Sequence, residues 1–155
     1  MISDSGSRRS FESGAVRDIQ DGKGRPSLMP LEIVYTLLNR DDIMYCLGYF
    51  KDDRSPVHLY DALRFFSSMA YNGSDETMLL EVSKHFEEGH KKYPPAEDGT
   101  PNWQLGIPVD CYMDSAIRHY LKWRRGDKDE PHDRAFVWNI MCCIWEIEVH
   151  EKEVA

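Results

Sequence analysis

The fold is decided by Phe86–Asn139, FEEGHKKYPPAEDGTPNWQLGIPVDCYMDSAIRHYLKWRRGDKDEPHDRAFVWN. The pattern predicts three helical pieces joined by two short polar loops, because apolar residues recur at helical spacing between runs of proline, glycine and acidic residues. Each piece carries acid or imidazole groups, and helical bundles build ligand and metal sites from side chains on facing helices. The stretch therefore predicts an all-α protein with a site where these pieces meet.

The rest of the chain extends the helical pattern in both directions. Pro94–Pro95 end the first piece, the second runs from Val109 to about Arg125, and the third from about His132 to Val149. Upstream, helices are predicted over 31–50, with a break or kink at 39–42, over 56–70, and from Ser74 or Asp75 onward. No convincing β pattern is present. We expect a bundle of about five helices over residues 31–155, preceded by an extended arm over residues 1–30.

Composition restricts the function classes. The chain has 155 residues, 41% of them apolar, which suits one domain with a real core. Its formal charge of −8 argues against a nucleic-acid polymer as partner. No apolar run approaches the roughly 20 residues of a membrane span, and the first ten residues lack the apolar core of a signal peptide. We therefore expect no membrane contact and a cytoplasmic protein.

The first 30 residues are rich in glycine and interleaved with cations. Within GKGRP, Lys23 and Arg25 could bind phosphate oxygens where glycine lets the backbone approach a ligand. The spacing of a P-loop is absent. The alternative is a flexible terminal tail, which composition alone favours.

The candidate metal ligands are carboxylates spread over the three pieces of the deciding stretch. They are Glu87, Glu88, Asp114, Glu130 and Asp133. Paired carboxylates can hold one or two Mg²⁺ or Mn²⁺ ions beside a phosphate, with one ion activating water. Glu87 or Glu130 would place or deprotonate that water, while Arg118 and Lys92 would neutralise charge on phosphorus. The alternative is that these acids are solvated helix caps.

A second set of residues could contact the base or sugar of a nucleotide. It consists of Asn102, Trp103, His119, His132 and Asn139. An aromatic residue in a polar loop can stack on a base, or it can anchor the loop to the core. His119, a lone histidine on its helix, could likewise be a hydrogen-bonded structural residue.

The chain resembles the phage dATP/dGTP pyrophosphohydrolases linked to 2-aminoadenine genomes, which are assigned to the MazG-like all-α nucleotide pyrophosphohydrolases. The resemblance lies in residues 4–30, FEEGHKKY at 86–93, NWQLGIP at 102–108, DSAIRHYLKWRRGDKDEPH at 114–132 and AFVWN at 135–139. It implies Mg²⁺-dependent hydrolysis of dGTP and dATP to the monophosphate and pyrophosphate. The dGMP would supply synthesis of the modified purine nucleotide, and dATP would be removed. It also implies a functional role for the arm, and a homo-oligomer.

The sequence departs from the MazG-like pattern at one point. Glu130 and Asp133 fit E-x-x-D, but no clean E-x-x-E precedes them. Glu87 with Glu88, or Glu87 with Asp114, could substitute. Two other functions stay open: an HD-type phosphohydrolase, suggested by His119 and the His132–Asp133 dipeptide, and a helical interaction protein without enzyme activity.

Overall fold

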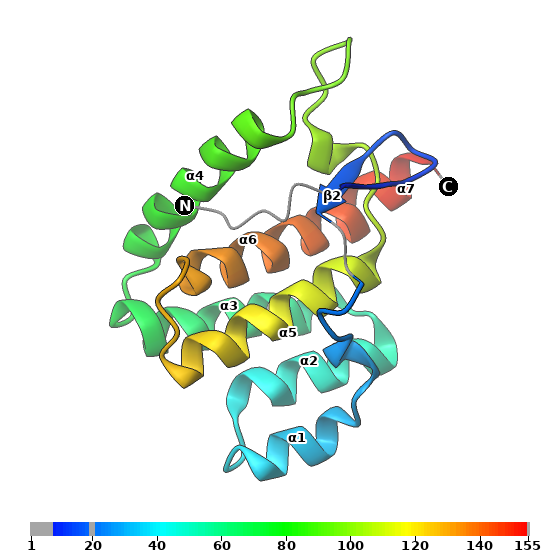
Figure 1. Cartoon of the computed structure of the whole chain (residues 1–155). Helices are drawn as coiled ribbons and strands as arrows, with labels where there is room; N and C mark the ends of the chain where they lie inside the picture. The colour runs from blue at the N-terminus through cyan, green and yellow to red at the C-terminus, as the bar shows by residue number, and fades with distance from the viewer. Residues whose placement is uncertain (1–7, 19–20, 155) are drawn as a thin grey trace.

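The computed structural model of the chain describes residues 8–18 and 21–154 and is almost entirely helical (Figure 1). Its helices are α1 (Leu31–Leu37), α2 (Asp42–Asp53), α3 (Pro56–Tyr71), α4 (Asp75–Lys92), α5 (Val109–Arg125), α6 (His132–Trp145) and α7 (Glu151–Val154). The predicted all-α class is confirmed, and α5 begins and ends where the pattern placed it. No helix in the described ranges is both long and apolar enough to cross a membrane.

The N-terminal arm differs from its prediction, because it contains a short antiparallel ribbon. Strands β1 (Arg8–Ser10) and β2 (Val16–Asp18) pair with Arg9 opposite Arg17. The expectation of no β structure is wrong at this point. Three-residue strands are too short to give a periodic signal, and their stability comes from contacts with the helical body. The predicted arm also includes residues 1–7 and 19–20, which lie outside the described residues.

The predicted break near residue 40 is a full separation of two helices. Asn39 and Arg40 take left-handed backbone conformations, with φ of 57° and 60°, which end α1. Asp41 then caps α2 by accepting a hydrogen bond from the Met44 amide at 2.9 Å. At the other end of the chain, α6 continues through a wide π-helical turn, Glu146–His150, into α7.

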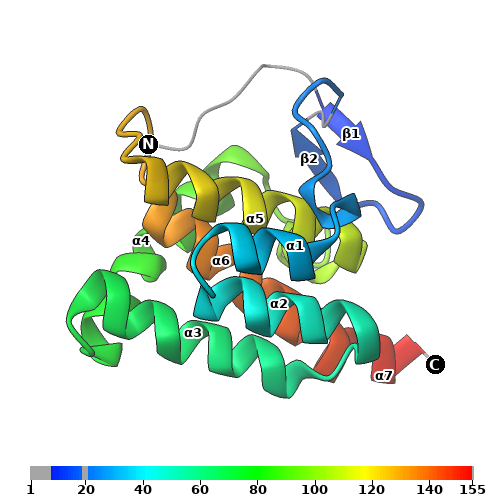
Figure 2. The ribbon, with the colours of Figure 1, turned by 90° about the horizontal axis from the view of Figure 1, so that it is seen from below.

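Helices α5 and α6 form the centre of the bundle, and the other helices pack around them (Figures 1 and 2). Phe66 of α3 lies in this core, with its ring 4.6 Å from that of Phe136 and 4.9 Å from that of Trp123, centroid to centroid. α4 packs on α6, and α2 joins α3 to α1. The buried Asp41 ties α2 to α5 by accepting hydrogen bonds from the Tyr120 hydroxyl and, at 2.6 Å, from Arg124 Nη1.

Two buried polar side chains dock the arm onto this bundle. Asp114 of α5 is fully buried and accepts hydrogen bonds from Arg25 Nε and from the Ser27 amide, both at 2.9 Å. Ser27 lies in a short 3₁₀ helix, Pro26–Leu28. Asn102, in a second 3₁₀ turn (Asn102–Gln104), donates to the Val16 carbonyl and accepts from the Val16 amide, each at 2.8 Å. The arm is therefore held at two points, so β2 lies against the end of the helical body.

Candidate functional site

A pocket of about 640 Å³ opens between the arm, α4, the loop after α4, α5 and α6. This volume lies in the range of small-molecule sites, roughly 300–1,000 Å³. The walls come from segments far apart in the sequence, with Arg17 on β2, His85 on α4, Trp103 on the loop, Arg118 on α5 and Asn139 on α6. The docked arm thus completes a cavity that the helices alone leave open.

The pocket is cationic although the chain carries a net charge of −8. The following basic side chains line it and are called the cationic wall below: Arg9, Arg17, Lys23, Lys92, Arg118, Lys122 and Arg125. Of the carboxylates in the described ranges, Asp18 and Glu130 line it. A concave surface with one sign of charge focuses its field on a ligand of the opposite sign, so this pocket suits a polyanion.

Arg17 is a half-buried cation of the wall with contacts to both α5 and α6. One guanidinium nitrogen, Nη2, donates to Ser115 Oγ at 3.4 Å and to Asn139 Oδ1 at 3.2 Å, and the group lies 5.3 Å from the Tyr112 ring centroid. The other, Nη1, is buried with no hydrogen-bond partner among the described residues. A buried donor without a partner costs free energy unless a ligand or water completes it. Two further buried nitrogens, His85 Nδ1 and Trp138 Nε1, also have no hydrogen-bond partner among the described residues, and both residues line the pocket.

Two predicted nucleotide-binding residues, Asn102 and Asn139, line the pocket but use their side-chain amides to hold other parts of the protein. The side-chain oxygen and nitrogen of Asn102 are both hydrogen-bonded to the Val16 backbone, as described above, so this residue holds β2 in place. Asn139 accepts from Arg17 and donates to the Ala135 carbonyl at 2.8 Å, which orients the guanidinium. Although Asn102 and Asn139 line the pocket, their amides are occupied by protein partners, and we expect them to position other groups.

Aromatic rings form one side of the pocket. Trp103 lies edge-on against Phe86 at 5.6 Å and against Trp145 at 5.0 Å between ring centroids. Phe86, Trp103 and Trp138 all line the cavity. Trp103 therefore both anchors its loop and faces the pocket, so the two alternatives drawn from the sequence are compatible. Aromatic rings beside a cationic wall suit a base joined to a phosphate chain.

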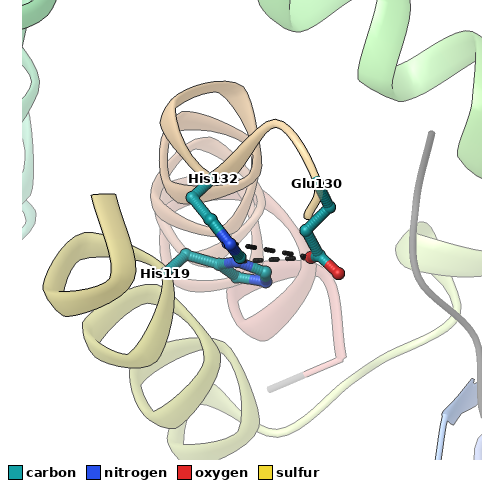
Figure 3. Close-up of side chains that lie close together, drawn as sticks. All are labelled: His119, Glu130 and His132. Atoms are coloured by element: carbon teal, nitrogen blue, oxygen red, sulfur yellow. Dashed lines mark hydrogen bonds and ion pairs between the residues drawn. The ribbon is translucent and has the colours of Figure 1, made fainter. Parts of the chain in front are cut away.

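One corner of the pocket brings together His119 of α5, Glu130 of the loop before α6, and His132 of α6 (Figure 3). We call these three residues the imidazole corner. The two Nδ1 atoms lie 2.9 Å apart, and Glu130 Oε1 lies 3.5 Å from His119 Nδ1 and 3.9 Å from His132 Nδ1. The other nitrogen of His132, Nε2, lies 2.7 Å from Asp129 Oδ1. His119 and Glu130 line the pocket, and His132 lies behind them.

Burial sets the charge state of several pocket residues. It lowers the pKa of His119 well below the ordinary imidazole value, and the neighbouring His132 and Lys122 act in the same direction. Burial also lowers the pKa of His85 to about 4, with a further contribution from Arg134. Both imidazoles are therefore neutral at pH 7. Burial lowers the pKa of Arg118, which Asp114 partly offsets, and Arg118 Nη1 donates to the Gly24 carbonyl at 2.7 Å.

The five predicted carboxylate ligands do not come together around one ion. Glu87 is exposed, Glu88 accepts from Arg134 at 2.7 Å, and Asp133 accepts from the Tyr71 hydroxyl at 3.0 Å. Asp114 is enclosed by its contacts with the arm, as described above. In the described ranges, only Glu130 of the five belongs to a group that could share a metal ion with two other side chains. The five carboxylates therefore do not form a common set of ligands for Mg²⁺ or Mn²⁺ in the described residues.

Three of the four predicted phosphate-binding residues lie at the pocket, and one lies outside it. Lys23, Lys92 and Arg118 line the pocket. Arg25 is paired with Asp114 and lies outside the lining. Sequence reasoning missed Arg17, Arg9, His85, Trp138, Lys122 and Arg125 as pocket residues. The interleaved arginines of the arm gave a signal for Arg17, but nothing in the sequence linked it to residues 98 and 122 positions further along the chain.

The comparison with known families agrees with a phosphate-binding pocket. A family model described as "dATP/dGTP diphosphohydrolase, N-terminal" matches residues 68–155, which is more than half of the chain. The chain belongs to this family. It is accordingly a hydrolase acting on nucleoside triphosphates, with dATP and dGTP as the family's substrates. The match spans α4, α5 and α6, and therefore the imidazole corner, but not the arm. No curated protein and no solved structure matches the chain.

Proposed function

We propose that the pocket binds the triphosphate of dATP or dGTP against the cationic wall and hydrolyses it at the α-phosphorus. The supporting observation is the wall itself, and above all the buried Arg17 Nη1 that has no partner among the described residues. A guanidinium presents several donors in a planar fork that fits phosphate oxygens. Lys23, Lys92 and Arg118 line the same cavity and would neutralise the rest of the phosphate chain.

In the proposed reaction one water molecule is consumed. Its oxygen forms a bond to the α-phosphorus, the bond from the α-phosphorus to the bridging oxygen breaks, and pyrophosphate leaves with that oxygen. The water's protons pass to a base and to solvent. Of the two candidates for placing this water, Glu130 lines the pocket and Glu87 is exposed outside it. We therefore assign the role to Glu130.

Mg²⁺ remains part of the proposal as an ion that arrives with the triphosphate. Mg²⁺ often binds through one or two carboxylates together with substrate phosphates, and it would supply charge neutralisation there. Because the five predicted carboxylates do not gather around one point, we assign no common set of protein ligands to Mg²⁺. The wider biological role is likewise proposed: a MazG-like phage enzyme, active as a homo-oligomer in the host cytoplasm, that supplies dGMP for 2-aminoadenine nucleotides and removes dATP.

Hydrolysis in ¹⁸O-labelled water tests this reaction directly. With dGTP as substrate, label should appear in dGMP, and pyrophosphate should be unlabelled. Label found only in pyrophosphate would place the attack on the β-phosphorus and contradict the assignment.

An HD-type phosphohydrolase is the second candidate, because His119 and His132 do meet in the structure. That class would release triphosphate. Asp133, its third expected member, instead accepts from Tyr71 and lines a separate pocket of about 380 Å³. Release of intact triphosphate from dGTP would support this candidate over the first.

A further inference from the structure

The imidazole corner brings three potential electron-pair donors close together. His132 Nε2 lies 2.7 Å from Asp129 Oδ1, which places a hydrogen-bond acceptor at that nitrogen and leaves Nδ1 directed at the corner. Glu130 Oε1 is also an acceptor. Two imidazole nitrogens and one carboxylate oxygen therefore lie within 4.8 Å of one another, and each of the three can act as a metal ligand.

We propose that His119, Glu130 and His132 form a binding site for a divalent first-row transition metal such as Mn²⁺, Co²⁺ or Zn²⁺. Bond lengths of about 2.0–2.2 Å to such an ion place neighbouring ligand atoms about 3.0–3.5 Å apart. The three separations here are 2.9, 3.5 and 3.9 Å, so small side-chain movements would suffice. Two imidazoles and one carboxylate suit these metals, whereas Mg²⁺ prefers oxygen ligands alone.

The surroundings of the corner support a metal site in two further ways. His132 is 1% exposed, and its contact with Asp129 is the arrangement in which a carboxylate orients a metal-binding histidine and fixes its tautomer. His119 and Glu130 line the pocket, so the coordination positions left open by three protein ligands face the cavity. Such positions accept water or a phosphate oxygen in catalytic metal sites.

A second, neighbouring group of potential ligands is a weaker candidate for the metal site. Asp127, Asp129 and His132 also lie close together, on the Nε2 side of the His132 ring. Asp127 is already held by Arg125 through two contacts, at 2.5 and 2.8 Å, and Asp129 is 63% exposed. The two arrangements differ in their ligands, and substitution can therefore distinguish them.

The role of the metal in hydrolysis rests on the proposed function. Binding of the metal to the corner can be measured without nucleotide. Tag-free protein is stripped with a chelator and titrated with Co²⁺, and the visible absorption of the bound ion is followed. Mn²⁺ binding is measured in parallel by equilibrium dialysis with excess Mg²⁺ present. We expect one ion per chain, and no displacement by Mg²⁺.

Variants locate the site. His119→Gln and Glu130→Gln should weaken Co²⁺ binding by more than about 100-fold, and Asp129→Asn by about tenfold, because an orienting partner typically contributes 10- to 100-fold. His90→Gln, a histidine of the same pocket outside the corner, and Asp127→Asn should bind as the wild type does. Circular dichroism checks folding, and the exposed Asp129 allows a test even if the buried variants unfold.

Wild-type protein that binds no transition metal would overturn the proposal, as would a His119→Gln variant that is folded and binds normally. Loss of binding in Asp127→Asn together with normal binding in His119→Gln would move the ion to the other group and overturn it too. If the protein binds Mn²⁺ at the imidazole corner but releases triphosphate from dGTP, the proposed metal site is correct and the proposed attack on the α-phosphorus is wrong.

Discussion

Two residues in the middle of α5, Asp114 and His119, lie five positions apart and have different surroundings. Asp114 is completely buried, with one oxygen accepting from Arg25 and the other from the Ser27 amide. Less than two turns later, His119 meets Glu130 and His132 at the edge of the pocket. Asp114 therefore holds the arm, whereas His119 lies at the pocket. Both oxygens of Asp114 already accept from protein donors, while Glu130 beside His119 belongs to a group that could hold a metal ion.

Glu130→Gln should produce the largest effect on activity. The substitution keeps the shape of the side chain and removes its charge from the imidazole corner, so kcat for dGTP should fall about 100- to 1,000-fold. The free energy of unfolding should change by less than about 1 kcal/mol. Steady-state kinetics and thermal melts measure both.

Glu87→Gln is the matched comparison for Glu130→Gln. Glu87 is exposed outside the pocket, so kcat should stay within about twofold of the wild-type value. The reverse result, with Glu87→Gln inactive and Glu130→Gln active, would restore the assignment drawn from the sequence and refute the pocket-based one.

Arg17→Ala should have the next largest effect, because it removes the wall cation whose buried Nη1 has no partner among the described residues. A hydrogen bond to a charged group contributes about 1.5–3 kcal/mol, so kcat/KM should fall about 10- to 100-fold. Arg54→Ala is the control, since Arg54 pairs with Glu151 at 3.0 Å and does not line the pocket. Equal kinetics for the two variants would show that the wall does not bind the substrate.

Asp114→Asn tests the contact by which α5 holds the arm. Removing this buried charge leaves Arg25 without its carboxylate, and the free energy of unfolding should fall by about 1–3 kcal/mol. Looser docking of the arm should raise KM for dGTP only about fivefold, because Asp114 itself lies outside the pocket lining. Asp110→Asn, an exposed change on the same helix, should alter neither quantity. A Asp114→Asn variant that is fully stable but inactive would make Asp114 a ligand after all.

Lys23→Ala should have the smallest effect. Lys23 is 40% exposed and pairs with Asp18 at 2.9 Å at the rim of the pocket. Exposed charges are screened by solvent and salt, so KM should rise about two- to threefold at low ionic strength and less at high salt. Lys51→Ala, outside the pocket, serves as the control. A loss as large as that of Arg17→Ala would make Lys23 a central phosphate ligand.

The sequence was sufficient for most of the helical fold. Apolar periodicity and the prolines at 94, 95, 108 and 131 bound α4, α5 and α6 closely, because these signals are local. The sequence did not allow the partners of the buried carboxylates to be predicted in the same way. Asp114 is neutralised by Arg25, 89 residues earlier in the chain, and no local pattern encodes that pairing. Arg17 reaches the pocket through a three-residue strand held by Asn102, which is equally non-local.

The most direct test of the central claim is a crystal structure with a dGTP analogue that cannot be cleaved between the α- and β-phosphates. We expect the triphosphate to lie against the cationic wall, with Arg17 Nη1 within hydrogen-bond distance of a phosphate oxygen. The α-phosphate should face Glu130 and the base should lie beside Trp103. An analogue bound outside this pocket, or with its triphosphate directed away from Arg17 and Glu130, would contradict the account.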